Sequence, residues 1–184
     1  MSIRGKAFIV GSYEHPGRRL PDKSVSQIHA EVCIAALKDA GLSLNDVDGL
    51  FYTGYLSMGA TALSDYMGLN NLKVMDTTMT GGSSPVIHIG HAAMAIATGR
   101  CNVALVSLAA RPRSERAMRA APNPEASFEQ VFGTNTISMY ALAAQRHMYE
   151  FGTTSEQLAW VKVAASQHAQ YNEHALLRLS LIHI

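Results

Sequence analysis

A short turn rich in glycine and serine contains the residue types best suited to chemistry. Gly81 and Gly82 stand before Ser83 and Ser84, and a helix is predicted to begin at Pro85. Glycine N–H groups just before a helix can approach a thioester oxygen or a developing oxyanion closely. The structural alternative is that the glycines let the backbone turn tightly and the serines cap the helix. Capping is favoured for the serines, because a nucleophilic serine needs a positioned base; both interpretations of the glycines stay open.

Two histidines follow on the predicted helix. The i, i+3 spacing of His88 and His91 could present both imidazoles to one metal ion. No third ligand is evident from the sequence. No metal site is therefore predicted, and a hydrogen-bonded pair in the core is favoured.

The composition is that of a globular protein without a strong electrostatic signal. Of the 184 residues, 48% are hydrophobic and 16% are charged, and the formal net charge is +1. Neither nucleic acid nor an acidic membrane is predicted as a partner. Cys33 and Cys101 are too few and too far apart for a disulfide framework or a CxxC metal site, which fits a cytoplasmic setting. The sequence shows no export signal and no membrane span.

Short apolar runs alternate with helical patterns along the chain. A capping box at 24–27 predicts the start of a helix that Gly41 ends, and a second capping box stands at 154–157. Strands are predicted at 6–13, 49–53, 73–77 and 102–109, and further helices at 85–98, 134–151 and after 154. This alternation predicts an α/β fold with a parallel or mixed sheet covered by helices. The polar segment 111–132 is predicted to run over the surface.

The predicted helix at 85–98 has no polar face. Pro85 suits its first position, and Gly99 is placed just past its end. Its other residues are apolar or small on nearly every side, so we expect a buried helix in which Ile89, Ala93 and Ile96 are not all exposed. The methionines at positions 58, 67, 75 and 94 are expected to fill the core.

Two separate motifs, in the right order, resemble the thiolase superfamily. The turn at 77–84, the helix ending AMAIATG and the strand NVALV are similar to the family's nucleophile region, where the turn reads roughly Cys-Ala-Ser-Gly-Ser. Further on, 151–159 (FGTTSEQLA), followed by His168 and Asn172, is similar to the family run YGTTxEQLA. The pattern looks most like the sterol-carrier and lipid-transfer-protein thiolase branch, often labelled acetyl-CoA acetyltransferase, and extends to Arg178.

The resemblance implies the N-terminal portion of a thiolase-like α/β fold. That fold contains the βαβαβαββ repeat twice, so 1–110 would be the core of the first repeat and 111–178 the loop region and helices of the N-terminal half. The second repeat is missing from these residues. Because the later family motifs contribute a histidine and a second acid/base group, the 184 residues alone are expected to be inactive. The family is usually dimeric through the strand before the turn, here about 73–76.

The departure from the family lies at the centre of the turn. Aligning Gly82 and Ser83 with the family's Gly-Ser pair places Met79 where the nucleophilic cysteine would stand. A thioether has no ionisable proton and cannot form an acyl-enzyme. The catalytic residues are therefore unknown, while the resemblance implies Gly81, Gly82 and Ser83 as substrate-binding residues.

The function implied by the resemblance is that of a thiolase-like acyltransferase acting on acyl-CoA thioesters, in lipid, sterol side-chain or fatty-acid metabolism. Two alternatives stay open: a retro-aldol carbon–carbon lyase on a CoA thioester, and a non-catalytic acyl-CoA- or lipid-binding subunit. The CoA thioester is expected as substrate, with no tightly bound cofactor. A homodimer is expected, and whether it also requires a small OB-fold partner protein stays open. The arginines of the surface segment could grip CoA phosphates, but a solvated basic loop is favoured; they are Arg111, Arg113, Arg116 and Arg119.

The last six residues, 179–184, are set apart from the fold. Their sequence LSLIHI is encoded by CTG TCT CTT ATA CAC ATC, which looks like a transposon end used in sequencing-library preparation. The family pattern also fades at this place. These residues are predicted to be sequencing-adaptor sequence.

Overall fold

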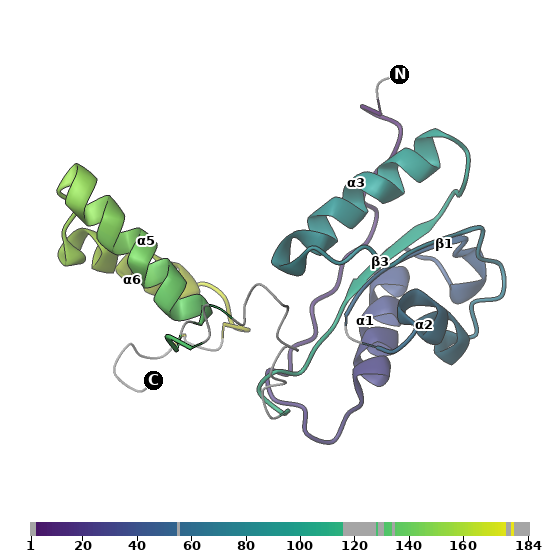
Figure 1. The fold of residues 1–184 in the computed structure, drawn as a ribbon. Helices are drawn as coiled ribbons and strands as arrows, with labels where there is room; N and C mark the ends of the chain where they lie inside the picture. The colour runs from purple at the N-terminus through teal and green to yellow at the C-terminus, as the bar shows by residue number, and fades with distance from the viewer. Residues whose placement is uncertain are drawn as a thin grey trace. The chain divides into compact units, whose positions relative to one another are not determined.

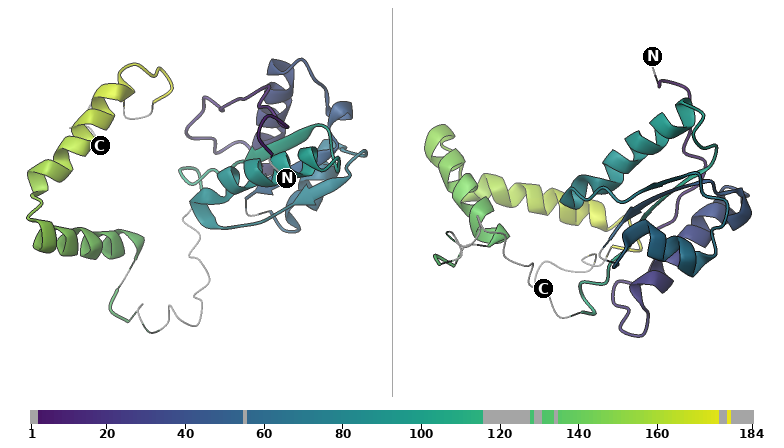
Figure 2. Two further views of the ribbon diagram at one scale, coloured as in Figure 1. Left: turned by 90° about the horizontal axis from the view of Figure 1, so that it is seen from above. Right: turned by 45° about the vertical axis from the view of Figure 1, so that its right-hand side comes forward.

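The computed structural model describes residues 3–54, 56–115, 128, 131–133, 135–175 and 178. Contacts divide the chain into two units, Met1–Ala117 and Met118–Ile184. The first unit is a three-layer arrangement in which helices cover both faces of a small sheet (Figures 1 and 2). Its elements are α1 (Val25–Asp39), the 3-10 helix η1 (Leu44–Asp46), β1 (Gly49–Thr53), α2 (Gly59–Met67), β2 (Val74–Asp76), the 3-10 helix η2 (Gly81–Ser83), α3 (Ser84–Ala97) and β3 (Ala104–Leu108).

The sheet is parallel and β1 is its central strand. The order is β2-β1-β3, and Gly49 stands opposite both Val74 and Ala104. Leu50 and Tyr52 pack with residues of α1 and α2, whereas Phe51 packs with α3. Both faces of β1 are thus covered, which explains its unbroken apolar sequence. The predicted α/β class is confirmed; the full βαβαβαββ repeat is not, because the described sheet has three strands.

Asp48 joins the three strands just before β1 begins. Its carboxylate accepts hydrogen bonds from the main-chain N–H groups of Asn102 and Val103, each at 2.8 Å, and from Lys73 Nζ at 3.1 Å. Its own carbonyl accepts from the N–H groups of Lys73 and Val74. Burial raises the pKa of Asp48, but the hydrogen bonds from Val103, Asn102 and Lys73 outweigh that effect and the pKa lies below its ordinary value. Asp48 is therefore an ionised residue at the base of the sheet.

The predicted strand at 6–13 is wrong. This segment pairs with no strand among the described residues, and Phe8, Ile9 and Val10 are all more than half exposed. Gly11 instead lies against α1, where a Cβ on it would stand 2.5 Å from the carbonyl oxygen of Ala36. An apolar β-rich run becomes a strand only when a neighbouring strand satisfies its backbone, and the described residues supply none here.

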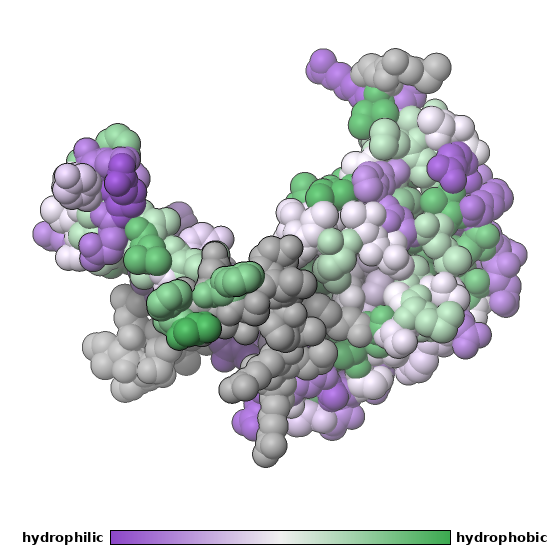
Figure 3. Space-filling view, viewed as in Figure 1, coloured by the Kyte–Doolittle hydropathy of each residue, from purple (hydrophilic) through white to green (hydrophobic). Residues whose placement is uncertain are grey.

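The expectation for α3 is confirmed in its stated form, because Ile89 is exposed but Ala93 and Ile96 are half-buried; full burial is reached on one face only. Ser84, His88, Ala92 and Ala95 recur at helical spacing and are buried against the sheet. Val86, Ile89 and Met94 lie on other faces and are exposed by 72, 44 and 51%. Figure 3 shows that apolar and polar side chains share the exposed surface of this unit in that view. The described chain offers a single layer for α3 to pack on, so its apolar sequence is only partly enclosed.

Methionine fills the core less than expected. Met67 is buried, but Met58, Met75 and Met94 are exposed by 76, 49 and 51%. The helix α2, which the sequence analysis did not predict, contributes Ala60, Leu63 and Met67 to the core.

The second unit consists of two helices with well-formed N-termini. They are α5 (Thr136–Phe151) and α6 (Ser155–Ala169). The capping box predicted at 154–157 is confirmed, because the side chains of Thr154 and Gln157 each accept from the other's main-chain N–H. Neither helix contains a buried residue. Across the described residues, none of the helices has the length and apolar character needed to cross a membrane.

His29 is a fully buried imidazole between α1 and β3. Its Nδ1 lies 2.7 Å from Ser107 Oγ, its ring lies 4.9 Å from the Tyr52 ring centroid to centroid, and its Nε2 has no hydrogen-bond partner among the described residues. Burial lowers the pKa of His29 to about 4. The folded protein therefore holds His29 neutral near pH 7.

We expect the free energy of unfolding to fall as the pH drops from 6.5, the ordinary value for histidine, towards about 4. In this window the unfolded chain binds a proton at His29 and the folded chain does not, so folding opposes protonation. The loss attributable to this residue is at most about 3 kcal/mol. Urea unfolding between pH 4.5 and 7.5 measures it. The variant His29→Gln should show a shallower pH dependence; an unchanged slope would contradict the assignment.

Candidate functional site

The segment between β2 and α3, residues 77–83, is termed the glycine turn. It ends in η2, and Ser84 is fully buried beneath it. Ser84 Oγ accepts from the N–H of Thr80 at 2.7 Å and donates to the carbonyl of Gly81 at 2.8 Å. Ser83 Oγ donates to the carbonyl of Thr80 at 3.1 Å. The prediction that the serines cap α3 is wrong, because the 3-10 turn brings main-chain groups of the turn itself within reach of both hydroxyls.

The two glycines of the turn have different reasons to be glycine. Gly81 adopts a φ of +74°, which a residue with a Cβ rarely adopts. Gly82 has no such φ, and a Cβ on it would meet no atom within 4 Å. The interpretation that the glycines let the backbone turn tightly is therefore confirmed for Gly81 and is wrong for Gly82. Gly81, Gly82 and Ser83 are all exposed, so the surface predicted to contact substrate is accessible.

The turn carries no ionisable sulfur. Met79 is 44% exposed, and its Sδ accepts a weak hydrogen bond from Ser84 Oγ at 3.6 Å. Cys33 lies in α1 and Cys101 precedes β3, and both are buried. Burial raises the pKa of Cys33 to about 11, against a hydrogen bond to Ser107, and burial followed by the charge of Asp48 raises the pKa of Cys101. Neither thiol is a reactive nucleophile in the folded chain.

We expect both cysteines to resist alkylation at pH 7.5. Reagents such as iodoacetamide need the thiolate and access to it, and Cys33 and Cys101 are 2 and 1% exposed. Mass spectrometry of the folded protein should show less than about a tenth of the labelling seen in urea, since labelling then requires unfolding. Rapid labelling of either cysteine in the native state would show that the buried thiols open readily.

A cluster of polar side chains surrounds Asp76 where β2 ends. Asp76 Oδ1 accepts from both the N–H and the hydroxyl of Thr78, at 2.7 and 2.6 Å, and Oδ2 lies 2.5 Å from His91 Nδ1. His88 Nε2 lies 3.8 Å from Oδ1, and His88 Nδ1 lies 3.0 Å from Thr53 Oγ1 at the end of β1. Burial raises the pKa of Asp76, but the hydrogen bonds from Thr78 and His91 outweigh it and the pKa is about 2.

This cluster corrects the prediction of a satisfied core pair of histidines. His88 is fully buried, but its Nε2 has no hydrogen-bond partner among the described residues. The side chain of His91 is 38% exposed. The sequence analysis missed Asp76, although a carboxylate at the carboxyl end of a parallel strand is a recognisable signal, because functional groups gather at that edge of α/β sheets.

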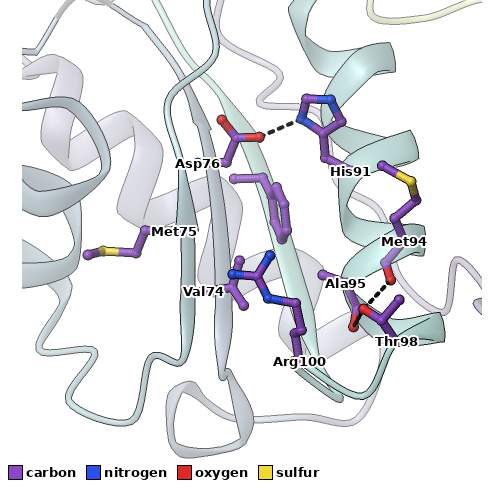
Figure 4. Close-up of a pocket in the computed structure, with 9 residues that line it drawn as sticks. Val74, Met75, Asp76, His91, Met94, Ala95, Thr98 and Arg100 are labelled. Carbon is purple, nitrogen blue, oxygen red and sulfur yellow. Dashed lines mark hydrogen bonds and ion pairs between the residues drawn. The ribbon is translucent and has the colours of Figure 1, made fainter.

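A cavity of about 470 Å³ lies beside the cluster, between β2 and α3. Figure 4 shows the Asp76–His91 contact on one side and Arg100 farther along the cavity, with Met75 pointing away from α3. Phe51, Met94 and Ala95 give the rest of the wall an apolar character.

The arginines predicted as candidate phosphate ligands are only partly described. Arg111 donates to Glu115 at 2.7 Å and to the carbonyls of Pro21 and Lys23, so it links two surface segments of the first unit. Arg116 and Arg119 lie outside the described residues, as do the predicted adaptor residues 179–184. The geometry gives no support to a phosphate role for Arg111.

Comparison with known proteins places this geometry in context. The chain is 31% identical to 17-hydroxy-3-oxo-4-pregnene-20-carboxyl-CoA lyase of Mycobacterium tuberculosis over 94% of the chain and 48% of that protein. It is 30% identical to the steroid side-chain-cleaving aldolase of Thermomonospora curvata, over 94% and 47%. With the acetyl-CoA acetyltransferase of Methanothermobacter thermautotrophicus it shares 27% identity, over 91% and 46%. No protein-family model matches the chain.

The fold is also similar to a solved structure. A chain of the Ltp2-ChsH2(DUF35) aldolase superposes with a TM-score of 0.76 at 31% sequence identity, covering 85% of this chain and 41% of that one. The chain spans about half the length of the curated relatives it matches. It is homologous to thiolase-like enzymes acting on CoA thioesters, which include acetyl-CoA acetyltransferases and steroid side-chain-cleaving aldolases.

Proposed function

We propose that the chain is the N-terminal portion of a lyase that cleaves a carbon–carbon bond next to a CoA thioester by a retro-aldol route. The observation that carries the proposal is the thioether of Met79, which aligning Gly82 and Ser83 with the family's Gly-Ser pair assigns to the nucleophile position and which cannot form a thioester with an acyl group. The relatives that are 31 and 30% identical are named as a lyase and an aldolase, which supports the same choice.

A retro-aldol reaction needs a base and a pocket that stabilises an enolate, but no covalent intermediate on the enzyme. The substrate class is a β-hydroxyacyl-CoA. A base removes the hydroxyl proton, the Cα–Cβ bond breaks as the carbonyl forms, and the electron pair passes to the thioester as an enolate. Protonation of that enolate at Cα releases a shortened acyl-CoA beside a ketone or aldehyde. In our proposal the main-chain N–H groups of Gly81 and Gly82, two exposed residues at the start of η2, receive the thioester oxygen, because the first N–H groups of a helical turn lack partners within it.

The acyltransferase interpretation is the second candidate. It is favoured by the relatives named acetyl-CoA acetyltransferase, which are 27% identical to the chain. An acyl transfer through a covalent intermediate would require a nucleophile other than Met79. A non-catalytic binding subunit is the third possibility.

The proposal includes partners for the complete protein. β2 lies at the edge of the described sheet, where a second copy could pair with it to form a homodimer. The structural neighbour is named for two components, Ltp2 and ChsH2, which motivates including a small OB-fold partner protein in the assay.

The test uses the protein from the complete coding sequence, with and without a co-expressed partner. It is incubated with a β-hydroxyacyl-CoA, or with a β-ketoacyl-CoA plus free CoA, and the products are identified by mass spectrometry. We expect a carbonyl product and a shortened acyl-CoA from the first substrate, without consumption of free CoA. Turnover only of the second substrate would establish the acyltransferase, and binding without turnover of either would establish the non-catalytic role.

A further inference from the structure

Asp76 connects β2, the glycine turn and α3. It belongs to β2, and its Oδ1 atom receives both donors of Thr78, the second residue of the glycine turn. Its Oδ2 atom receives His91 from the middle of α3. His88, also on α3, is directed at the same carboxylate and reaches Thr53 of β1 with its other nitrogen. One side chain thus fixes the turn relative to both the strand before it and the helix after it.

Hydrogen bonds within the glycine turn and to Ser84, the first residue of α3, tie residues 80–84 into a single segment. Thr80, Gly81 and Ser84 are joined through Ser84 Oγ, and Ser83 binds back to Thr80. These contacts hold the segment together but do not attach it to the sheet. The pair of hydrogen bonds from Thr78 to Asp76 attaches the start of the glycine turn to β2, while the end of the turn continues into α3.

We infer that Asp76 and His91 are positioning residues that hold the glycine turn in place for catalysis, with His91 acting through Asp76. This inference rests on the proposed function. A displacement of about 1 Å in a binding group can lower turnover as much as 100-fold. The role requires a hydrogen-bond donor at the place of His91 Nδ1, which keeps Oδ2 occupied and the carboxylate in its orientation. It does not require the imidazole as a base.

The experiment therefore compares two replacements of His91 in the complete enzyme. His91→Asn keeps an N–H donor close to the position of Nδ1, whereas His91→Leu removes the donor and keeps an apolar side chain. We expect His91→Leu to lower kcat by about ten-fold or more and His91→Asn to stay within about three-fold of the parent, with KM changing less than kcat in both. Rates are normalised to the amount of folded protein that binds the CoA thioester, which removes any effect of misfolding.

Thr98→Val is the matched control, at the residue that follows the last turn of α3. Among the described residues the Thr98 hydroxyl bonds only to the carbonyls of Met94 and Ala95, so the variant changes the end of α3 without touching Asp76. Its kcat and KM should match those of the parent. A loss in His91→Asn as large as that in His91→Leu would overturn the positioning role in favour of direct participation of the imidazole. Parent-like turnover in His91→Leu would overturn it as well.

Hydrogen exchange provides a readout that does not depend on activity. The N–H groups of Thr78 and Thr80 are hydrogen-bonded in the turn, so their exchange reports its attachment. Peptides covering 76–84 should exchange faster in His91→Leu than in the parent, but not in His91→Asn. If the parent turns over no CoA thioester yet this pattern is seen, the proposed reaction fails while the positioning role stands. If these peptides exchange at the same rate in His91→Leu as in the parent, the positioning role is wrong, whatever activity the variant has.

Discussion

Replacing Asp48 with alanine is expected to lower the free energy of unfolding of the first unit by about 2 kcal/mol. The alanine leaves two main-chain N–H groups, those of Asn102 and Val103, without the carboxylate that accepts them at 2.8 Å. Asp48 is buried, but Asn102 is exposed and Val103 is half-buried, so each lost hydrogen bond is expected to cost about 1 kcal/mol. The same change removes the carboxylate to which Lys73 donates, and Lys73 is the residue directly before β2.

Asp48→Asn is the matched control. Its side-chain oxygen can still accept from the two N–H groups, but the negative charge is lost and the amide nitrogen faces Lys73. We expect a destabilisation clearly smaller than that of alanine. Urea midpoints of the two variants and the parent, followed by far-UV circular dichroism, measure the difference. Equal stability of Asp48→Ala and the parent would mean that the sheet does not depend on this carboxylate.

The elements whose local sequence decides their structure were predictable. The strand at 49–53 matches β1 to the residue, and Ser24 receives the N–H of Gln27 at the start of α1 as the capping pattern predicts. The reciprocal bond of that capping box is not formed, because Gln27 donates to Glu31 instead. Neighbouring side chains therefore decide even contacts that a short motif specifies.

The errors arose where structure depends on distant partners. The run at 6–13 has strand composition, but the described chain offers no strand to pair with it, and Gly11 fits against α1 instead. The apolar faces of α3 predict burial, yet packing requires a second layer as well as an apolar surface. The Asp76 cluster was missed because Thr53, Asp76, His88 and His91 come from three elements. Spacing along one helix shows that His88 and His91 share a region, but not which carboxylate they meet.

The second prediction of large effect separates the two glycines of the turn. Gly81→Val should destabilise the protein by about 1–2 kcal/mol, because Gly81 has a φ of +74° and a β-branched residue is strained there. Gly82→Val should leave the stability within about 0.5 kcal/mol of the parent, since a Cβ at Gly82 meets no atom within 4 Å. Thermal unfolding of the two variants measures this contrast.

Catalytic activity should be lost in Gly82→Val, the variant that keeps its stability. If the thioester oxygen binds at the exposed face of the turn, the side chain in Gly82→Val occupies that surface, and we expect turnover by the complete enzyme to fall by about 100-fold, comparable to the loss of an oxyanion-hole donor. Met79→Leu should be mild, because leucine has a similar volume and the thioether has no covalent role. A stable but inactive Gly82→Val beside an active Met79→Leu assigns catalysis to the glycine turn without a nucleophile. The reverse pattern would place the active site elsewhere, and an acyl group found on Ser83 or Ser84 by mass spectrometry would replace the retro-aldol route with serine catalysis.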